Sequence, residues 1–209
     1  SLNLSMMDGT EVPQGISLVR GRGEELDFSM DNALTNYFLH AMSDSSNWLL
    51  VVEDGFRLES PIILDVQTGG VASVAHISLE IGGMAEFELV TRISGTSDWF
   101  GLLRTGNIGS GAILNDVVIG LQENGTFLRS DSIEIGRDAQ VRAGTVSSGS
   151  ERTKSDLRYK LEERGGSIKV LGSILSAESM HLDHHIEIHH EAPDTCLLYT
   201  SDDADEGLG

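Results

Sequence analysis

Glycines recur at an almost constant interval through the chain, and this period constrains the fold more than any other feature of the sequence. The glycines of the series are Gly55, Gly82, Gly109, Gly136 and Gly165. Their intervals are 27, 27, 27 and 29 residues, and Ala85, Ala112 and Ala139 keep the same period, with Ser167 following 28 residues later. A fixed period of this size is typical of solenoids, whose repeats bury their apolar side by stacking on one another.

Between the glycines, apolar and polar residues alternate with a period of two. Ile77, Leu79 and Ile81 alternate with Ser78 and Glu80, and similar runs flank the other glycines. This pattern is typical of strands joined at glycine turns. We therefore predict an all-β fold, a right-handed parallel β-helix with about 27 residues and two or three strands per coil. An antiparallel sandwich with regular turns is the alternative.

A short stretch before the repeats has a different, helical pattern. The apolar residues at helical spacing are Leu34, Tyr37, Phe38 and Ala41. Asp31 precedes them as a candidate N-cap, and the stretch 31–42 has no Gly or Pro. We predict an N-terminal segment over residues 1–45, with a helix that covers the strand edges of the first coil, and a β-helix core over residues 46–195.

The chain is strongly acidic, with 33 Asp and Glu against 14 Lys and Arg and a net charge of −19 over 209 residues. This charge argues against partners such as nucleic acid and anionic membranes. No apolar run approaches the ~18 residues of a membrane helix, and the single cysteine, Cys196, excludes an internal disulfide. We therefore expect a cytoplasmic protein. Because the first residue is Ser1, we expect the chain to be a fragment.

Histidines cluster near the end of the predicted core, where five of the seven fall within residues 181–190. Strand alternation places His184 and His190 on one face with the apolar residues. The opposite face carries His181, Asp183, His185, Glu187 and His189. Imidazole and carboxylate ligands suit zinc or iron, so His181, Asp183, His185 and His190 are weak metal candidates. Row neighbours lie ~6.6 Å apart, so a site needs a further ligand from another coil or a partner.

Motifs for catalysis are missing from the sequence. The glycine pairs lack the Gly-Lys-Ser/Thr of a phosphate loop, and no Gly-x-Ser-x-Gly elbow occurs. We therefore predict no catalytic residues and no enzymatic activity.

Three stretches resemble the SufB/SufD family, the scaffold subunits of the Suf iron–sulfur cluster assembly system. Residues 51–62 read VVEDGFRLESPI and residues 154–161 read KSDLRYKL. The most specific stretch is the histidine segment, where His181, Asp183 and His185 precede His190 and Pro193 in the family's spacing. The segment favours the SufD branch over SufB. The resemblance covers about residues 45–195 and carries the β-helix fold with it.

The sequence departs from the family pattern in two ways. His184 and Ile186 stand where the family usually has Asn and Thr, and 194–195 replace a common His-Cys. Residues 196–209 resemble a translated sequencing-adapter read-through, so we expect a non-native tail and a natural chain cut near residue 195. The family's Cys-x-His motif and the C-terminal helices that dock SufC would lie beyond that point.

The resemblance implies a scaffold that pairs with a SufB-like paralogue and a SufC-like ATPase. It further implies that no cofactor binds this fragment alone and that an iron–sulfur cluster belongs to the complex. We expect the fragment not to bind SufC by itself, and a homodimer is possible in isolation. Two other functions remain open, a polysaccharide lyase or hydrolase on a secreted-type β-helix, and a metal-binding protein that uses the histidine row.

Overall fold

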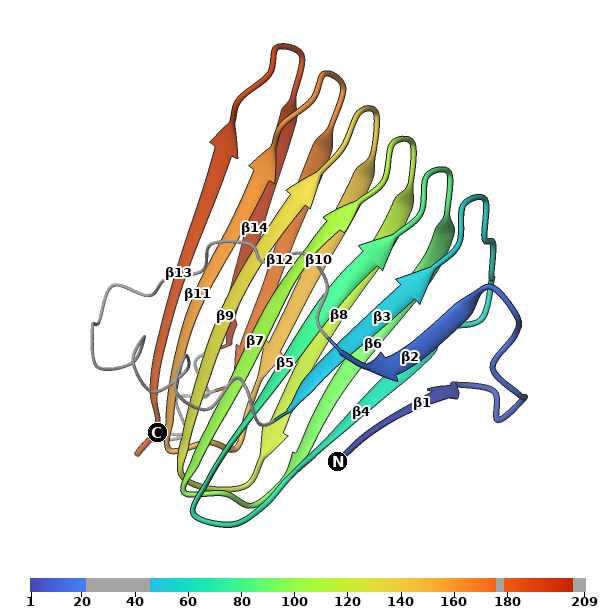
Figure 1. Ribbon diagram of the computed structural model, residues 1–209. Coiled ribbons are helices and arrows are strands. Elements are labelled where there is room, and N and C mark those ends of the chain that lie inside the picture. The colour runs from blue at the N-terminus through green and yellow to red at the C-terminus, as the bar shows by residue number, and fades with distance from the viewer. Residues whose placement is uncertain (22–45, 176–178, 205–209) are drawn as a thin grey trace.

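A computed structural model describes residues 1–21, 46–175 and 179–204, which form an all-β parallel solenoid (Figure 1). Its strands are β1 (Leu2–Met6), β2 (Ile16–Arg20), β3 (Asn47–Val52), β4 (Ile62–Thr68), β5 (Ala72–Ile81), β6 (Glu86–Gly95), β7 (Trp99–Ile108), β8 (Ile113–Gln122), β9 (Thr126–Ile135), β10 (Gln140–Ser147), β11 (Arg152–Leu161), β12 (Ser167–Leu175), β13 (His181–His190) and β14 (Cys196–Ala204). The predicted parallel β-solenoid is thus confirmed, and the helix expected over 31–42 lies outside the described residues.

Each coil contributes one strand to each of two sheets. One sheet has the order β1-β4-β6-β8-β10-β12-β14, and the other β13-β11-β9-β7-β5-β3-β2. The neighbours from β3 and β4 onward are parallel and keep a constant register. Two strands per coil therefore resolve the choice between two and three that the sequence left open.

The first coil is covered by strands. β1 pairs antiparallel with β4, and β2 pairs antiparallel with β3. Residues 2–20 therefore extend both sheets, and the strand edges that we expected a helix to cover are already paired by β1 and β2 (Figure 1).

The core lies between the two sheets, in the lumen of the solenoid. Alternate residues of each strand point inward, so columns of side chains in register stack from coil to coil. Leu50, Leu79 and Leu102 line one sheet, while Leu64 and Leu89 line the other, and all are at most 1% exposed. Burying each such side chain contributes about 1.5–3 kcal/mol.

The corner that carries the glycine series contains two different glycine positions. A Cβ on Gly82 would lie 2.5 Å from the backbone nitrogen of Asp54, and a Cβ on Gly109 2.6 Å from that of Gly83. These glycines are required by the close approach of successive coils. The second position, two residues later, has a positive φ, which is 69° at Gly111.

The register assigns the outer glycines of the series to this second position. Val52 pairs with Ile81, so Gly55 corresponds to Met84, which also has a positive φ of 57°. At the other end, Gln140 pairs with Ser167. Gly165 therefore matches Asp138, and Gly166, rather than Ser167, matches Ala139. The single series that we read in the sequence was wrong, because coils of slightly unequal length brought two positions into one apparent period.

The boundary that we set after residue 195 is not an end of the solenoid. β14 begins at Cys196 and pairs in parallel with β12 in the same register as the preceding strands. The structure thus includes residues 196–204 in the fold, while their origin as a non-native tail stays a prediction.

Candidate functional site

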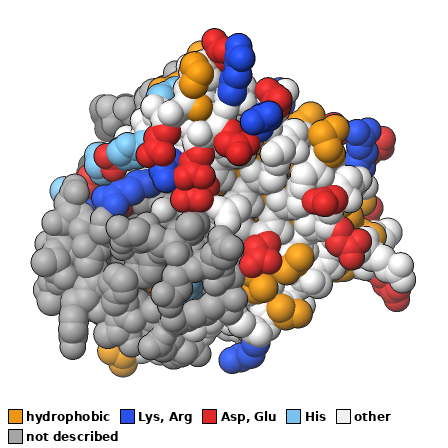
Figure 2. All heavy atoms as spheres, turned by 45° about the horizontal axis from the view of Figure 1, so that its top comes forward, with side chains coloured by type: hydrophobic (Ala, Val, Ile, Leu, Met, Phe, Trp, Pro, Cys, Tyr) orange, Lys and Arg blue, Asp and Glu red, His pale blue; other side chains and the backbone are white. Residues whose placement is uncertain are grey.

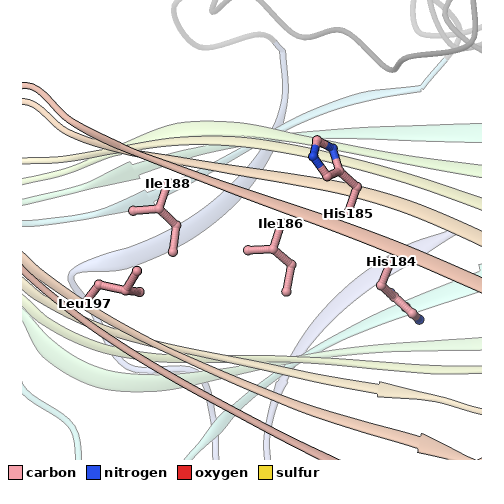
Figure 3. A pocket seen from close by; sticks show the side chains of 5 residues that line it. All are labelled: His184, His185, Ile186, Ile188 and Leu197. Carbon is pink, nitrogen blue, oxygen red and sulfur yellow. The ribbon is translucent and has the colours of Figure 1, made fainter.

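The histidine-rich strand β13 forms the last strand of its sheet, and its two faces differ as predicted. Ile186 and Ile188 point into the lumen and pack against the core. His184 shares their side of the strand, while His185 lies on the opposite side (Figure 3). The alternation in the sequence therefore predicted the orientation of this strand correctly.

The outward row is held by contacts with charged neighbours. Asp183 lies 3.7 Å from the Lys154 ammonium, and the carboxylate of Glu187 lies 3.0 Å from both Arg158 Nε and His189 Nε2. Figure 2 shows histidine side chains beside acidic and basic ones at this end of the molecule. The row is a mixed-charge surface, in which the acidic groups already have cationic partners.

The four metal candidates do not converge. His181, Asp183 and His185 are on the outward face of β13, whereas His190 is on the lumen side and its Nδ1 lies 2.5 Å from Thr195 Oγ1. Within residues 1–21, 46–175 and 179–204, no three His, Cys, Asp or Glu side chains are grouped closely enough to hold a metal ion. A metal on this strand would need ligands from outside the described part of the chain.

The lumen is hollowed where β13 and β14 end the stack. The hollow has a volume of about 490 Å³ and is lined by His184, His185, Ile186, Ile188 and Leu197. In Figure 3, the isoleucines and Leu197 project between the two sheets. The last coil therefore presents an apolar mouth with one imidazole at its inner side.

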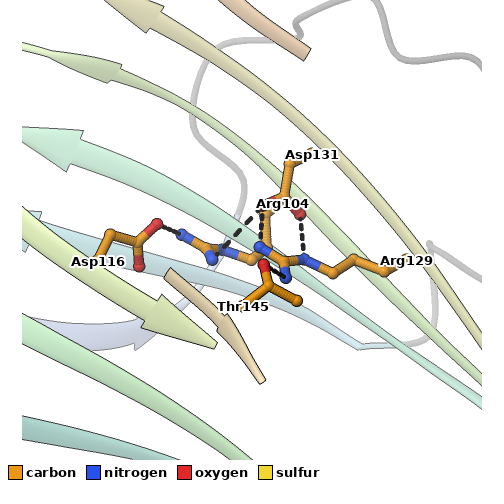
Figure 4. A network of polar contacts seen from close by, with 5 residues as sticks. All are labelled: Arg104, Asp116, Arg129, Asp131 and Thr145. Carbon is orange, nitrogen blue, oxygen red and sulfur yellow. Dashed lines mark hydrogen bonds and ion pairs between the residues drawn. The ribbon is translucent and has the colours of Figure 1, made fainter. Parts of the chain in front are cut away.

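Deeper in the lumen, four charged side chains form a buried network that crosses from sheet to sheet (Figure 4). Arg104 of β7 donates to Asp116 of β8 at 2.5 Å, and its other terminal nitrogen lies 3.5 Å from Asp131. Arg129 of β9 donates to both oxygens of Asp131 at 3.0 and 2.6 Å, and to Thr145 Oγ1 of β10 at 3.1 Å. Two guanidinium groups thus balance two carboxylates inside the solenoid.

This network sets the ionisation of its members. Burial opposes the charge on Asp131, but Arg129 and Arg104 outweigh it and lower the pKa of that carboxyl. Burial also opposes the charge on Arg104, which Asp116 and Asp131 offset, so the pKa of Arg104 is raised. The four groups are therefore charged at neutral pH.

Two neutral groups flank the network. Burial raises the pKa of Tyr159, and the nearby carboxylate of Asp131 adds to the effect. Burial also lowers the pKa of His184, with a further contribution from the charge of Arg129. At neutral pH, the lumen therefore combines two ion pairs with an uncharged phenol and an uncharged imidazole.

We did not predict this network from the sequence, although a signal was present. Arg129 and Asp131 follow Phe127 at a spacing of two and precede Ile133 and Ile135. They therefore occupy the apolar phase of a strand, where a charged residue must be paired in the interior. Reading the phase of charged residues, rather than their number, would have found them.

Comparison with known proteins identifies a family for most of this region. The model for "SUF system FeS cluster assembly, SufBD core domain" matches residues 64–201, more than half of the chain. A search of curated proteins and a search of solved structures each gave no match. In the described part of the chain, no helix is long and apolar enough to cross a membrane.

Proposed function

Because the chain belongs to the SufBD core-domain family of the SUF iron–sulfur cluster assembly system, we propose that it is a SufD-type scaffold subunit, without catalytic activity, of a complex with a SufB-like paralogue and a SufC-like ATPase. The observation that carries this proposal is the family match over a solenoid whose last strands, β13 and β14, each have a neighbour on one side only among the described strands.

The C-terminal end of the solenoid suits pairing with another chain. β13 is bonded to β11 and β14 to β12, so each presents its second edge beyond the stack. Unpaired edges are templates for strand addition. The apolar mouth formed by Ile186, Ile188 and Leu197 adds a surface that a partner would bury. We assign this end as the docking site for the paralogue.

The register shows which backbone groups of β13 are available. The amides of His181 and Glu191 donate to Glu151 and Leu161 on the β11 side. Because amide direction alternates along a strand, the odd-numbered amides of β13 point to β11. The even-numbered amides, such as that of Ile188, point to the open edge.

A proline at an even position therefore tests the edge without removing a bond to β11. We expect Ile188→Pro to lower recovery of the SufB-type paralogue at least tenfold when the chains are co-expressed and purified through a tag on this chain. Leu18→Pro is the matched control, because Leu18 of β2 also packs partly buried against the core, at the opposite end of the solenoid. It should retain the paralogue.

A second variant separates loss of docking from loss of folding. Leu197 is 42% exposed at the mouth, so Leu197→Glu should leave the far-ultraviolet circular dichroism and thermal midpoint unchanged while it reduces pairing. Equal recovery of the paralogue with wild type, Ile188→Pro and Leu197→Glu would refute docking at this end. Failure of the wild-type chain to retain any SufB-type partner would refute the proposed function.

We propose further that iron–sulfur clusters are cargo of the complex, and that this chain alone holds no cofactor. The outward histidine row supports this, because His185 lies 3.6 Å from the buried Asp156 and His189 lies near Glu187. We expect titration of the isolated chain with Zn²⁺ or Fe²⁺ to give the same weak affinity as His181→Ala and His185→Ala. A tenfold loss in either variant would instead support the metal-binding alternative.

A cytoplasmic location is part of the same proposal. Cys196 is an exposed free thiol, which is compatible with a reducing compartment. Fractionation of cells that produce the chain should recover it with cytoplasmic markers.

A further inference from the structure

The C-terminal half of the lumen contains buried polar atoms that the described residues leave without a hydrogen-bond partner. These atoms include Asp116 Oδ1, Ser155 Oγ, Tyr159 Oη and His184 Nε2. Asp116, Ser155 and Tyr159 are at most 4% exposed. Leaving such an atom unpaired costs about 1–3 kcal/mol, and the great majority of buried polar atoms in proteins are paired with protein or water.

The unpaired atoms follow one another toward the mouth of the solenoid. The hydroxyl of Tyr159 lies close enough to Asp116 and Asp131 for their charges to raise its pKa. Ser155 stands in register between Arg129 and His184, on the same inward column of the sheet. His184 lines the hollow at the end of the stack. Together they form a polar path from the buried network to the surface.

The opposite sheet leaves room along this path. Gly172 of β12 points inward beside Thr145, and a Cβ on Gly172 would have no described heavy atom within 4 Å. Thr145 remains partly accessible although it accepts a hydrogen bond from Arg129 inside the lumen. The space therefore reaches at least two coils inward from β14.

The chemistry of the atoms limits what can occupy this space. Arg104 and Arg129 are balanced by Asp116 and Asp131, so there is no net charge to attract an ion. The unpaired set combines acceptors with hydroxyls that both donate and accept. A small neutral molecule with both functions is required, and water has both in the smallest volume.

We propose that ordered water molecules occupy the C-terminal half of the lumen, where they bind Asp116, Tyr159, Ser155 and His184 and exchange with solvent through the mouth between β13 and β14. Buried waters typically make about three hydrogen bonds to groups that are otherwise unsatisfied. The polar network is then part of a hydrated interior, while the N-terminal half of the lumen is dry.

Oxygen-17 magnetic relaxation dispersion on the purified chain tests this proposal, because it detects waters held longer than the protein takes to tumble. We expect a dispersion step for the wild type and a loss of at least half of its amplitude in Gly172→Leu, whose side chain fills the path. Gly69→Leu is the matched control, because a Cβ on this exposed glycine also meets nothing within 4 Å, and it should keep the full step.

A crystal structure of the wild-type chain gives a readout that does not depend on any variant. Water oxygens at hydrogen-bond distance from Tyr159 Oη and Ser155 Oγ would support the proposal. A wild type without a dispersion step, a step that Gly172→Leu leaves unchanged, or a lumen that contains no water in the crystal would overturn it.

Discussion

The two halves of the solenoid are built on the same coil but fill it differently. Around β3 to β6 the lumen holds aliphatic side chains such as Leu50, Leu64 and Leu79, and antiparallel strands cover the first coil. From β7 onward the same inward columns hold Arg104, Asp131 and other polar groups, and the stack ends in an open mouth.

This difference shows how a repetitive fold separates stability from interaction. Apolar columns need only the neighbouring coil to be satisfied, so the N-terminal half is complete in itself. Polar columns and free edges need partners, which the C-terminal half obtains from its ion pairs and, in our proposals, from water and a second chain. The half with unsatisfied groups is the half that we assign to function.

The largest effect should come from breaking the ion network. Asp131→Ala leaves Arg104 and Arg129 without their shared carboxylate in the interior, and an uncompensated buried charge costs about 3–5 kcal/mol. Urea unfolding at neutral pH measures the free energy. Asp65→Ala is the control, because Asp65 pairs with Arg92 at 2.7 Å at the surface and should cost less than about 1 kcal/mol. Equal losses would show that the network contributes nothing special.

A core truncation in the apolar half should come next. Leu89 is fully buried, and Leu89→Ala should lower the free energy of unfolding by about 3 kcal/mol through lost burial and a residual cavity. Unlike the loss in Asp131→Ala, this loss should not change with salt concentration, because no charge is involved. A loss that varies with salt would blur the distinction between the two halves.

The corner glycines should have a smaller effect, shared by both halves. A Cβ on Gly109 would meet backbone atoms of Gly83 and Ile81 at 2.6–2.7 Å, which only a shift between coils can relieve. We expect Gly109→Ala to cost about 1–3 kcal/mol in urea unfolding. Gly69→Ala, which meets nothing within 4 Å, should be nearly neutral, and a neutral Gly109→Ala would contradict our account of the corner.

The smallest effect is a pH dependence at the open end. The pKa of His184 is lowered in the folded chain, first by burial and then by Arg129, so below about pH 6.5 the unfolded chain binds a proton that the folded chain resists. The contribution of His184 is therefore complete above its unfolded pKa, and stability falls as the pH decreases toward the folded pKa. His184→Gln should flatten the slope between pH 7 and pH 5, whereas an unchanged slope would rule out this role.

Much of this architecture could be predicted from the sequence, because stacking forces each coil to repeat. The alternation around Ile77 and Leu79 correctly gave parallel strands, and the alternation in 181–190 gave the two faces of β13. The glycine series was misread at Gly55 and Gly165, since coil lengths vary by a few residues and only backbone pairing shows which positions match.

The candidate site was less predictable, because it depends on contacts across the lumen. Arg104 and Asp116 lie on different sheets, and no local pattern connects them. The histidine cluster was visible in the sequence, but its density suggested a convergence that an extended strand does not allow. His190 points to the lumen while His181 and His185 point outward, so the four candidates stay apart.

Hydrogen–deuterium exchange of the chain, alone and with a SufB-type paralogue, tests the central claim most directly. The account predicts that binding slows exchange of β13 and β14, including the even-numbered amides of β13, while exchange in β1 and β2 stays the same. Protection confined to β1 and β2, or no protection anywhere in the solenoid, would contradict a scaffold that docks through its C-terminal end.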